Sequence, residues 1–169
     1  MLVKEKIGNL STIDTGNKTI DWLNLEWYET GKRIMHKRSQ SGVEVIMKFL
    51  NENQNLTQGD VLYQDSESVI AINIQPCEVL IIRPQNMYQM ACICYEIGNK
   101  HLPLFYEDEE VLVAYDAPLF RLIASSGYQV EKGERKLISP LKTTVAAHGH
   151  SGNGETLFSK IMRLTNPQE

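Results

Sequence analysis

The hydrophobic pattern of this chain changes at Pro76, and this change limits the folds that the chain can adopt. Before Pro76, apolar residues occur in short runs that are continuous or alternate with polar residues, which is the pattern of β-strands. After Pro76, strand-like runs alternate with two segments of helical spacing. A length of 169 residues is sufficient for two small domains. The sequence therefore predicts an α+β protein.

Residues 1–75 are predicted to form an N-terminal all-β domain. Turn residues separate the apolar runs, and Ser41-Gly42 and residues 65–68 supply tight turns. The alternation around Tyr63 predicts that the last two strands form a hairpin. The predicted strands are residues 2–7, 22–28, 33–37, 43–49, 60–64 and 69–74.

Residues 76–141 are predicted to form a ferredoxin-like domain with the order β-α-β-β-α-β. Gly98 and Gly127 are expected to end the two helices, because glycine readily adopts the left-handed conformation at a helix end. The predicted elements are strand 78–83, helix 85–97, strands 102–106 and 111–115, a helix beginning at residue 116 or 117, and a final strand. The first helix is expected to bury a face formed by Met87, Met90, Ala91, Cys94 and Ile97.

Residues 142–169 are predicted to be a flexible C-terminal tail that contains histidine. Periodicity is lost from about Leu141, and His148 and His150 are followed by Ser-Gly-Asn-Gly. Residues 156–164 regain helical spacing, which predicts a short amphipathic helix.

Composition and charge exclude several classes of function. The net charge of −4 is spread evenly and leaves no basic stripe for nucleic acid. No segment approaches the roughly 18 uncharged apolar residues of a membrane span, and the first residues lack the apolar region of a signal peptide. The three cysteines do not resemble a disulfide framework. We therefore expect a cytoplasmic protein that binds neither nucleic acid nor a membrane.

No motif in the chain indicates catalysis, so we expect that the protein is not an enzyme. The acidic run 107–110 lies between two predicted strands and is interpreted as a hairpin turn. Cys92 and Cys94 are two residues apart on a predicted helix, so they point about 200° apart and are interpreted as buried structural residues. A small hydrolase that uses either thiolate beside an imidazole is an alternative.

The four histidines are the remaining candidates for metal ligands. His36 lies beside Lys37 and Arg38 and is interpreted as a strand-surface residue. His101 lies between a predicted helix end and a strand, where the backbone fixes the ring without burying it. A lone histidine is usually structural, but a two-fold dimer with this helix end at its axis would bring two imidazoles together.

The tail offers a second candidate, because His148 and His150 are close enough on a pliable backbone to bind one ion. An ordinary polar tail is the alternative. Neutral imidazoles suit Ni(II), Cu(II) and Zn(II), and the ligand type does not select among these ions. The candidate metal ligands are therefore His101, His148 and His150, and no residue is predicted to be catalytic.

Residues 93–101 read Ile-Cys-Tyr-Glu-Ile-Gly-Asn-Lys-His, and this segment closely resembles the UreE family of urease accessory nickel metallochaperones. The resemblance covers roughly residues 1–150 in collinear order. It also includes residues 21–27, 32–34, 58–63, 115–116 and 134–136.

This resemblance implies a β domain that contacts protein partners and a ferredoxin-like domain that dimerises head to head. It implies that His101 of each subunit binds nickel at the dimer interface, with His148 and His150 as further ligands. It also implies a homodimer that delivers Ni(II) through the urease accessory GTPase to the apo-urease accessory complex for assembly of the urease active site. Zinc or copper are competing ions for the same site.

The sequence departs from the family pattern at three places. Lys100 stands where arginine is usual, the tail is poor in histidine and continues for 19 residues beyond His150, and the strand after His101 lacks the histidine pair of some members. These departures argue against storage of many ions. The alternative function is a non-catalytic dimeric interaction scaffold without a physiological metal.

Overall fold

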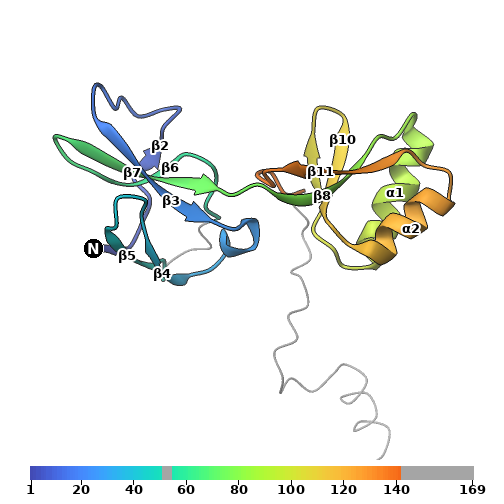
Figure 1. Ribbon diagram of the computed structural model, residues 1–169, viewed down its shortest axis with the longest axis horizontal. Helices are drawn as coiled ribbons and strands as arrows, with labels where there is room; N and C mark the ends of the chain where they lie inside the picture. Colours follow the sequence, from blue (N-terminus) through green and yellow to red (C-terminus); the bar gives the residue numbers. More distant parts are fainter. Residues whose placement is uncertain (51–54, 142–169) are drawn as a thin grey trace, which may run out of the picture.

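The computed structural model describes residues 1–50 and 55–141. It shows two domains built mostly of strands, with two helices in the second domain (Figure 1). The α+β class, with a β domain first and a βαββαβ domain second, is confirmed. The predicted tail, its predicted helix 156–164 and its two histidines lie outside the described residues. In the described part of the chain, neither helix is long and apolar enough to cross a membrane.

The N-terminal domain contains seven short strands that form two sheets around one apolar core. The strands are β1 (Leu2–Val3), β2 (Gly8–Asn9), β3 (Thr19–Leu25), β4 (Ile34–Arg38), β5 (Glu44–Lys48), β6 (Asp60–Gln64) and β7 (Ser68–Ile74). The strand order is β1-β5-β4 in one sheet and β2-β6-β7-β3 in the other. The predicted hairpin is present as the antiparallel pair β6 and β7.

Two predicted strands of this domain are wrong in extent. Of the predicted strand 2–7, only Leu2–Val3 form a strand, β1, which pairs with β5, and the chain then reaches the other sheet, where β2 pairs with β6. The predicted strand 22–28 ends at Leu25, because Trp27–Glu29 form a 3₁₀ turn, η1. The Glu29 carboxylate holds this turn by accepting a hydrogen bond from the Glu26 N–H at 3.1 Å and by pairing with the Lys37 ammonium.

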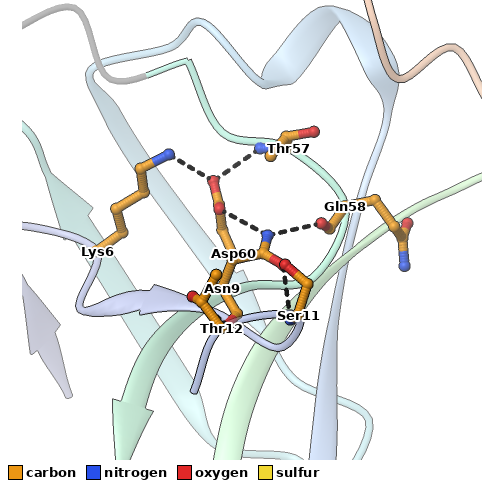
Figure 2. Close-up of polar contacts among 7 residues, drawn as sticks. All are labelled: Lys6, Asn9, Ser11, Thr12, Thr57, Gln58 and Asp60. Carbon is orange, nitrogen blue, oxygen red and sulfur yellow. Dashed lines mark hydrogen bonds and ion pairs between the residues drawn. The ribbon is translucent and has the colours of Figure 1, made fainter.

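A buried carboxylate fixes the loop that leads into β6. Asp60 is 2% exposed, and Figure 2 shows the groups that surround it. Its oxygens accept hydrogen bonds from Lys6 Nζ at 2.9 Å, from the Thr57 N–H at 2.9 Å and from Asn9 Nδ2 at 3.0 Å. These bonds hold the N-terminal segment against the loop that contains Gln58.

The C-terminal domain has the order β-α-β-β-α-β predicted from the sequence. Its elements are β8 (Cys77–Ile82), α1 (Met87–Asn99), β9 (Phe105–Glu107), β10 (Glu110–Ala114), α2 (Ala117–Ser125) and β11 (Val130–Arg135). The sheet is antiparallel with the strand order β11-β8-β10-β9. Asn86 and Asp116 cap the two helices by accepting hydrogen bonds from the N–H groups of Gln89 and Leu119.

Both faces of this sheet are buried. Leu80 and Ile82 of β8 pack with the two helices, which lie on the same face of the sheet (Figure 1). Val79 and Ile81 point to the opposite face, because side chains alternate along a strand. No helix of the described residues covers this second face, where Leu137 and Trp27 pack instead.

The predicted buried face of α1 is wrong in part. Ile93 and Ile97 are buried against the sheet, whereas Met87 is 82% exposed and Ala91 is also exposed. The helix carries apolar residues on two sides, so helical spacing alone did not identify the side that faces the core.

The contacts between the two domains include an aromatic pair and a lysine. The ring of Trp27 meets the ring of Phe105 edge to face, with centroids 5.6 Å apart. Lys136, which follows β11, donates a hydrogen bond from Nζ to Asn73 Oδ1 at 2.7 Å and lies 3.5 Å from Gln58 Oε1. One ammonium group of the second domain thus holds two side chains of the first.

We predict that Lys136→Met lowers the free energy of unfolding by about 1.5–3 kcal/mol, the contribution typical of a hydrogen bond to a charged group. Lys132→Met is the matched control, because Lys132 contacts Tyr115 and Glu78 within its own domain. Urea unfolding followed by tryptophan fluorescence measures both variants. An unchanged free energy of unfolding in Lys136→Met would show that the contact between domains adds nothing to stability.

Candidate metal centre

His101 lies directly after α1 in a left-handed backbone conformation, with φ of 55°. Its N–H donates a hydrogen bond to the Gly98 carbonyl at 2.9 Å, and the Leu102 N–H donates to the Ile97 carbonyl at 3.3 Å. This pair of bonds is the Schellman motif, which ends a helix with one left-handed residue. His101 is that residue.

The second helix ends in the same motif, with glycine at the left-handed position. Gly127 has φ of 77°, its N–H donates to the Ala124 carbonyl at 3.1 Å, and the Tyr128 N–H donates to the Ile123 carbonyl at 3.2 Å. The prediction that Gly127 ends this helix is confirmed. A residue with a β-carbon loses roughly 1–2 kcal/mol in this conformation, and glycine does not. His101 therefore occupies a position that favours glycine.

The prediction that Gly98 ends the first helix is wrong, because Gly98 lies inside α1. Ile97 is buried and Leu102 is half-buried, and both belong to the apolar cluster between helices and sheet. In a Schellman motif, an apolar residue in the last turn of the helix contacts an apolar residue just after the helix, and the left-handed residue directly precedes the second of the two. Because Leu102 is the second apolar residue here, the left-handed residue is His101.

This motif presents the His101 side chain at the surface of the second domain. Both of its neighbours in sequence are held, Lys100 by hydrogen bonds from its N–H to the last turn of α1 and Leu102 by the core. His101 itself is exposed. The backbone therefore fixes the direction of the Cα–Cβ bond of His101, and the sequence predicted the position of this histidine between a helix end and a strand.

The remaining histidines do not join His101 in the described structure. His36 lies on β4 with its side chain 62% exposed, 3.9 Å from Glu44, so the prediction of a strand-surface histidine is confirmed. His148 and His150 lie outside the described residues. Within residues 1–50 and 55–141, no three His, Cys, Asp or Glu side chains are grouped so as to hold a metal ion. The acidic run is the predicted turn between β9 and β10, with Asp108 and Glu109 both left-handed.

The cysteines do not have the environment of nucleophiles. Cys92 and Cys94 are half-buried rather than fully buried. Burial raises the pKa of the Cys94 thiol, which reduces its thiolate fraction. Cys92 shares hydrogen bonds with the hydroxyls of Tyr88 and Tyr128, and these bonds raise the pKa of both tyrosines. Nothing around either thiol favours the hydrolase alternative.

The sequence predictions missed an exposed apolar face on α1, formed by Met87, Tyr88, Ala91, Tyr95 and Gly98. Tyr88 is 75% exposed and Tyr95 is 69% exposed. These residues share one side of the helix, because Tyr88, Ala91, Tyr95 and Gly98 follow one another at intervals of three or four positions and Met87 lies four positions before Ala91. The sequence indicates this face by Tyr88 and Tyr95, which lie on the side of the helix opposite the buried Ile93. The face ends at Gly98, three residues before His101.

Comparison with known proteins supports the resemblance found in the sequence. The model of the UreE urease accessory protein N-terminal domain matches residues 3–75, and the model of the UreE C-terminal domain matches residues 77–156. The chain is 42% identical to the urease accessory protein UreE of Flavobacterium johnsoniae over 97% of this chain and 99% of that protein. It is 36% identical to UreE of Acetivibrio thermocellus, over 89% of this chain and 98% of that protein.

A β domain followed by a βαββαβ domain, matched in turn by the two UreE domain models, is thus the architecture of a urease accessory protein. This is a class of accessory proteins and not of catalysts, which confirms the expectation that the chain is not an enzyme. The chain belongs to the UreE family.

We predict that His101→Gly stabilises the metal-free protein by about 0.5–1 kcal/mol, because glycine relieves the left-handed conformation. The reciprocal change Gly127→His should destabilise it by a similar amount, since Gly127 occupies the equivalent position of α2. Urea unfolding in the presence of a chelator measures both. A loss of stability in His101→Gly would mean that the imidazole contributes to the fold.

Proposed function

We propose that this protein is a nickel metallochaperone that carries Ni(II) for assembly of the urease active site. It acts as a homodimer in which His101 of each subunit binds the ion and His148 and His150 supply further ligands. The observation that supports this proposal is the exposed imidazole of His101, held by a helix-ending motif in which glycine would be more favourable. Residues kept in an unfavourable backbone conformation are concentrated at functional sites.

The chemistry of the proposed ligands suits the proposed cargo. Imidazole nitrogen is a ligand for nickel, and also for Zn(II) and Cu(II), which compete for the same site. Metal binding requires neutral imidazole, so protons compete with the ion and acidification weakens binding. One histidine per subunit is sufficient to begin a site only if two subunits meet near it.

The exposed face of α1 provides the surface for that dimer. In a single subunit, α1 has apolar residues on two sides, and the side that does not face the core is exposed to water. Exposed apolar patches of this kind are typical of protein–protein interfaces. A two-fold contact through Tyr88 and Tyr95 would pack the α1 helices of two subunits together. If the two helices cross near Gly98, at the end of this face, the same contact brings the two His101 residues toward each other.

The parts of the chain have separate roles in this proposal. Residues 1–75 contact protein partners, residues 76–141 bind the metal and dimerise, and residues 142–169 contribute the tail ligands. The partners are the urease accessory GTPase and the apo-urease accessory complex, and the place of action is the cytoplasm. Family membership supports these roles, because the relatives are urease accessory proteins. The alternative is a dimeric interaction scaffold without a physiological metal, which nickel titration separates from the proposal.

We predict that His101→Gly abolishes tight Ni(II) binding while the protein stays folded. Metal sites with about four ligands contribute roughly 10–16 kcal/mol, or about 3 kcal/mol for each ligand, so loss of two ligands should weaken binding more than about a thousandfold. Isothermal titration with Ni(II) measures this, and His36→Ala is the control that keeps normal affinity. Tight binding by His101→Gly would refute the proposed site, and weak binding by the unchanged protein would favour the scaffold.

We predict that Tyr95→Glu dissociates the dimer. A carboxylate buried without a partner costs about 3–5 kcal/mol, which raises the dissociation constant more than about a hundredfold. Tyr63→Glu is the control, because Tyr63 is an exposed tyrosine of β6 in the other domain. Sedimentation velocity distinguishes monomer from dimer. A dimer that resists Tyr95→Glu would exclude α1 as the contact.

A further inference from the structure

Strand β4 lies at an edge of its sheet. The strand order is β1-β5-β4, and β4 pairs with β5 over the whole of Ile34–Arg38 without a bulge. Within residues 1–50 and 55–141, no strand pairs with the other side of β4. Proteins commonly protect such an edge by a very short strand or by a bulge, because its unpaired backbone groups can bind another chain. β4 has five residues and no bulge, so neither device protects it.

The register of β4 shows which of its backbone groups point away from β5. The Phe49 N–H of the chain after β5 donates a hydrogen bond to the Arg33 carbonyl at 2.8 Å. Bonding to the neighbouring strand alternates along an antiparallel pair, so Met35 and Lys37 are the next residues that bond to β5. The residues between them direct their N–H and C=O groups to the outer side of the sheet, and they are Ile34, His36 and Arg38.

The side chains of these three residues form one exposed row with apolar neighbours. Side chains alternate along a strand, and Met35 points to the other face, where it is buried. Ile34 is 61% exposed. His36 lies opposite Ile46 of β5, which lies opposite Leu2 of β1, and Leu2 is 52% exposed. Apolar side chains therefore lie beside the open edge, where an added strand would cover part of them.

This edge has an excess of positive charge, although the whole chain has a net charge of −4. Residues 32–38 contain four Lys or Arg side chains and no carboxylate. Glu29 pairs with two of these cations and Glu44 pairs with a third. Lys48 of β5 lies opposite Ile34 and adds a further cation. The cations at this edge therefore outnumber the carboxylates that pair with them.

The charge indicates what kind of chain fits the edge. A second copy of β4 would place like charges opposite each other, which is destabilising. We propose that β4 binds an extended acidic segment of a partner protein, which adds a strand to the sheet through the outward backbone groups of Ile34, His36 and Arg38. Main-chain hydrogen bonds hold the added strand, and its carboxylates select the basic edge.

This inference rests on the proposed function, in which residues 1–75 contact protein partners, and it adds the surface and the chemistry of that contact. The acidic side chains of the added strand would alternate with apolar ones, because the exposed row of β4 combines cations with Ile34. The contact lies in the first domain, so it is independent of the proposed ligand His101.

The first experiment uses a fluorescein-labelled eight-residue peptide of alternating glutamate and valine, titrated with the full chain and followed by fluorescence anisotropy. We expect saturable binding that is at least about tenfold tighter than binding of a peptide of alternating lysine and valine. Two further peptides carry N-methyl groups on every glutamate or on every valine. One of the two should lose binding and the other should keep it, because only alternate residues of an added strand bond to β4. Equal affinities of the two methylated peptides, or no preference for glutamate over lysine, would overturn the proposal.

The second experiment changes β4 itself. His36→Pro removes the outward N–H in the middle of the strand, whereas His36→Ala keeps it. We expect about fivefold to tenfold weaker binding of the glutamate peptide for proline only. Arg38→Glu should weaken binding of the glutamate peptide and strengthen binding of the lysine peptide, an exchange that misfolding cannot produce. Arg135→Glu is the matched control and should change neither, because Arg135 is an exposed cation on β11, an edge strand of the other domain.

Nickel titration separates this inference from the proposed function. None of these variants alters His101, so each should bind Ni(II) as the unchanged protein does. Weak nickel binding by the unchanged protein would refute the carrier role, whereas the peptide titrations would still decide the role of β4. Peptide binding that responds to Arg38→Glu but not to His36→Pro would show attraction by charge alone and would overturn the added strand. A dimer that dissociates in His36→Pro, measured by sedimentation velocity, would show that a second copy occupies the edge and would overturn the proposal as well.

Discussion

The sheet of the C-terminal domain is apolar on both faces, and the need to cover both faces determines how the rest of the chain is arranged. Four consecutive residues of β8, Val79 to Ile82, are buried and point alternately to the two sides. The helices α1 and α2 cover one side. The other side is covered by Leu137, which follows β11, and by Trp27 of the first domain. The contact between the domains and the path of the chain after β11 therefore have the same physical origin.

Helix α1 departs from local preference at two places. Its outer face carries exposed tyrosines where polar residues would be expected, and its terminating position carries His101 where glycine would be favoured. Well-folded sequences violate such rules chiefly at functional sites. Gly127 shows that the chain uses glycine at the equivalent position of α2, so the histidine is not a general property of its helix ends.

The order of elements was predictable from the sequence because each element has its own periodicity and turn residues. The second domain was predicted correctly in order, and β6 was predicted with its observed bounds. The buried side of α1 was not predictable, since Met87 and Ile93 both have helical spacing and only contact with the sheet separates them. For the candidate site, the sequence predicted the place of His101 between a helix end and a strand. Its left-handed conformation was not predictable, because that depends on the packing of Leu102 and Ile97.

Residues 136–141 show a different limit of sequence-based prediction. They have no regular secondary structure, and nothing in their order indicates that they cross a sheet and pair with Leu104 and Phe105. Their path follows from the apolar surface that the strands create, which the sequence reveals only as a continuous apolar β8.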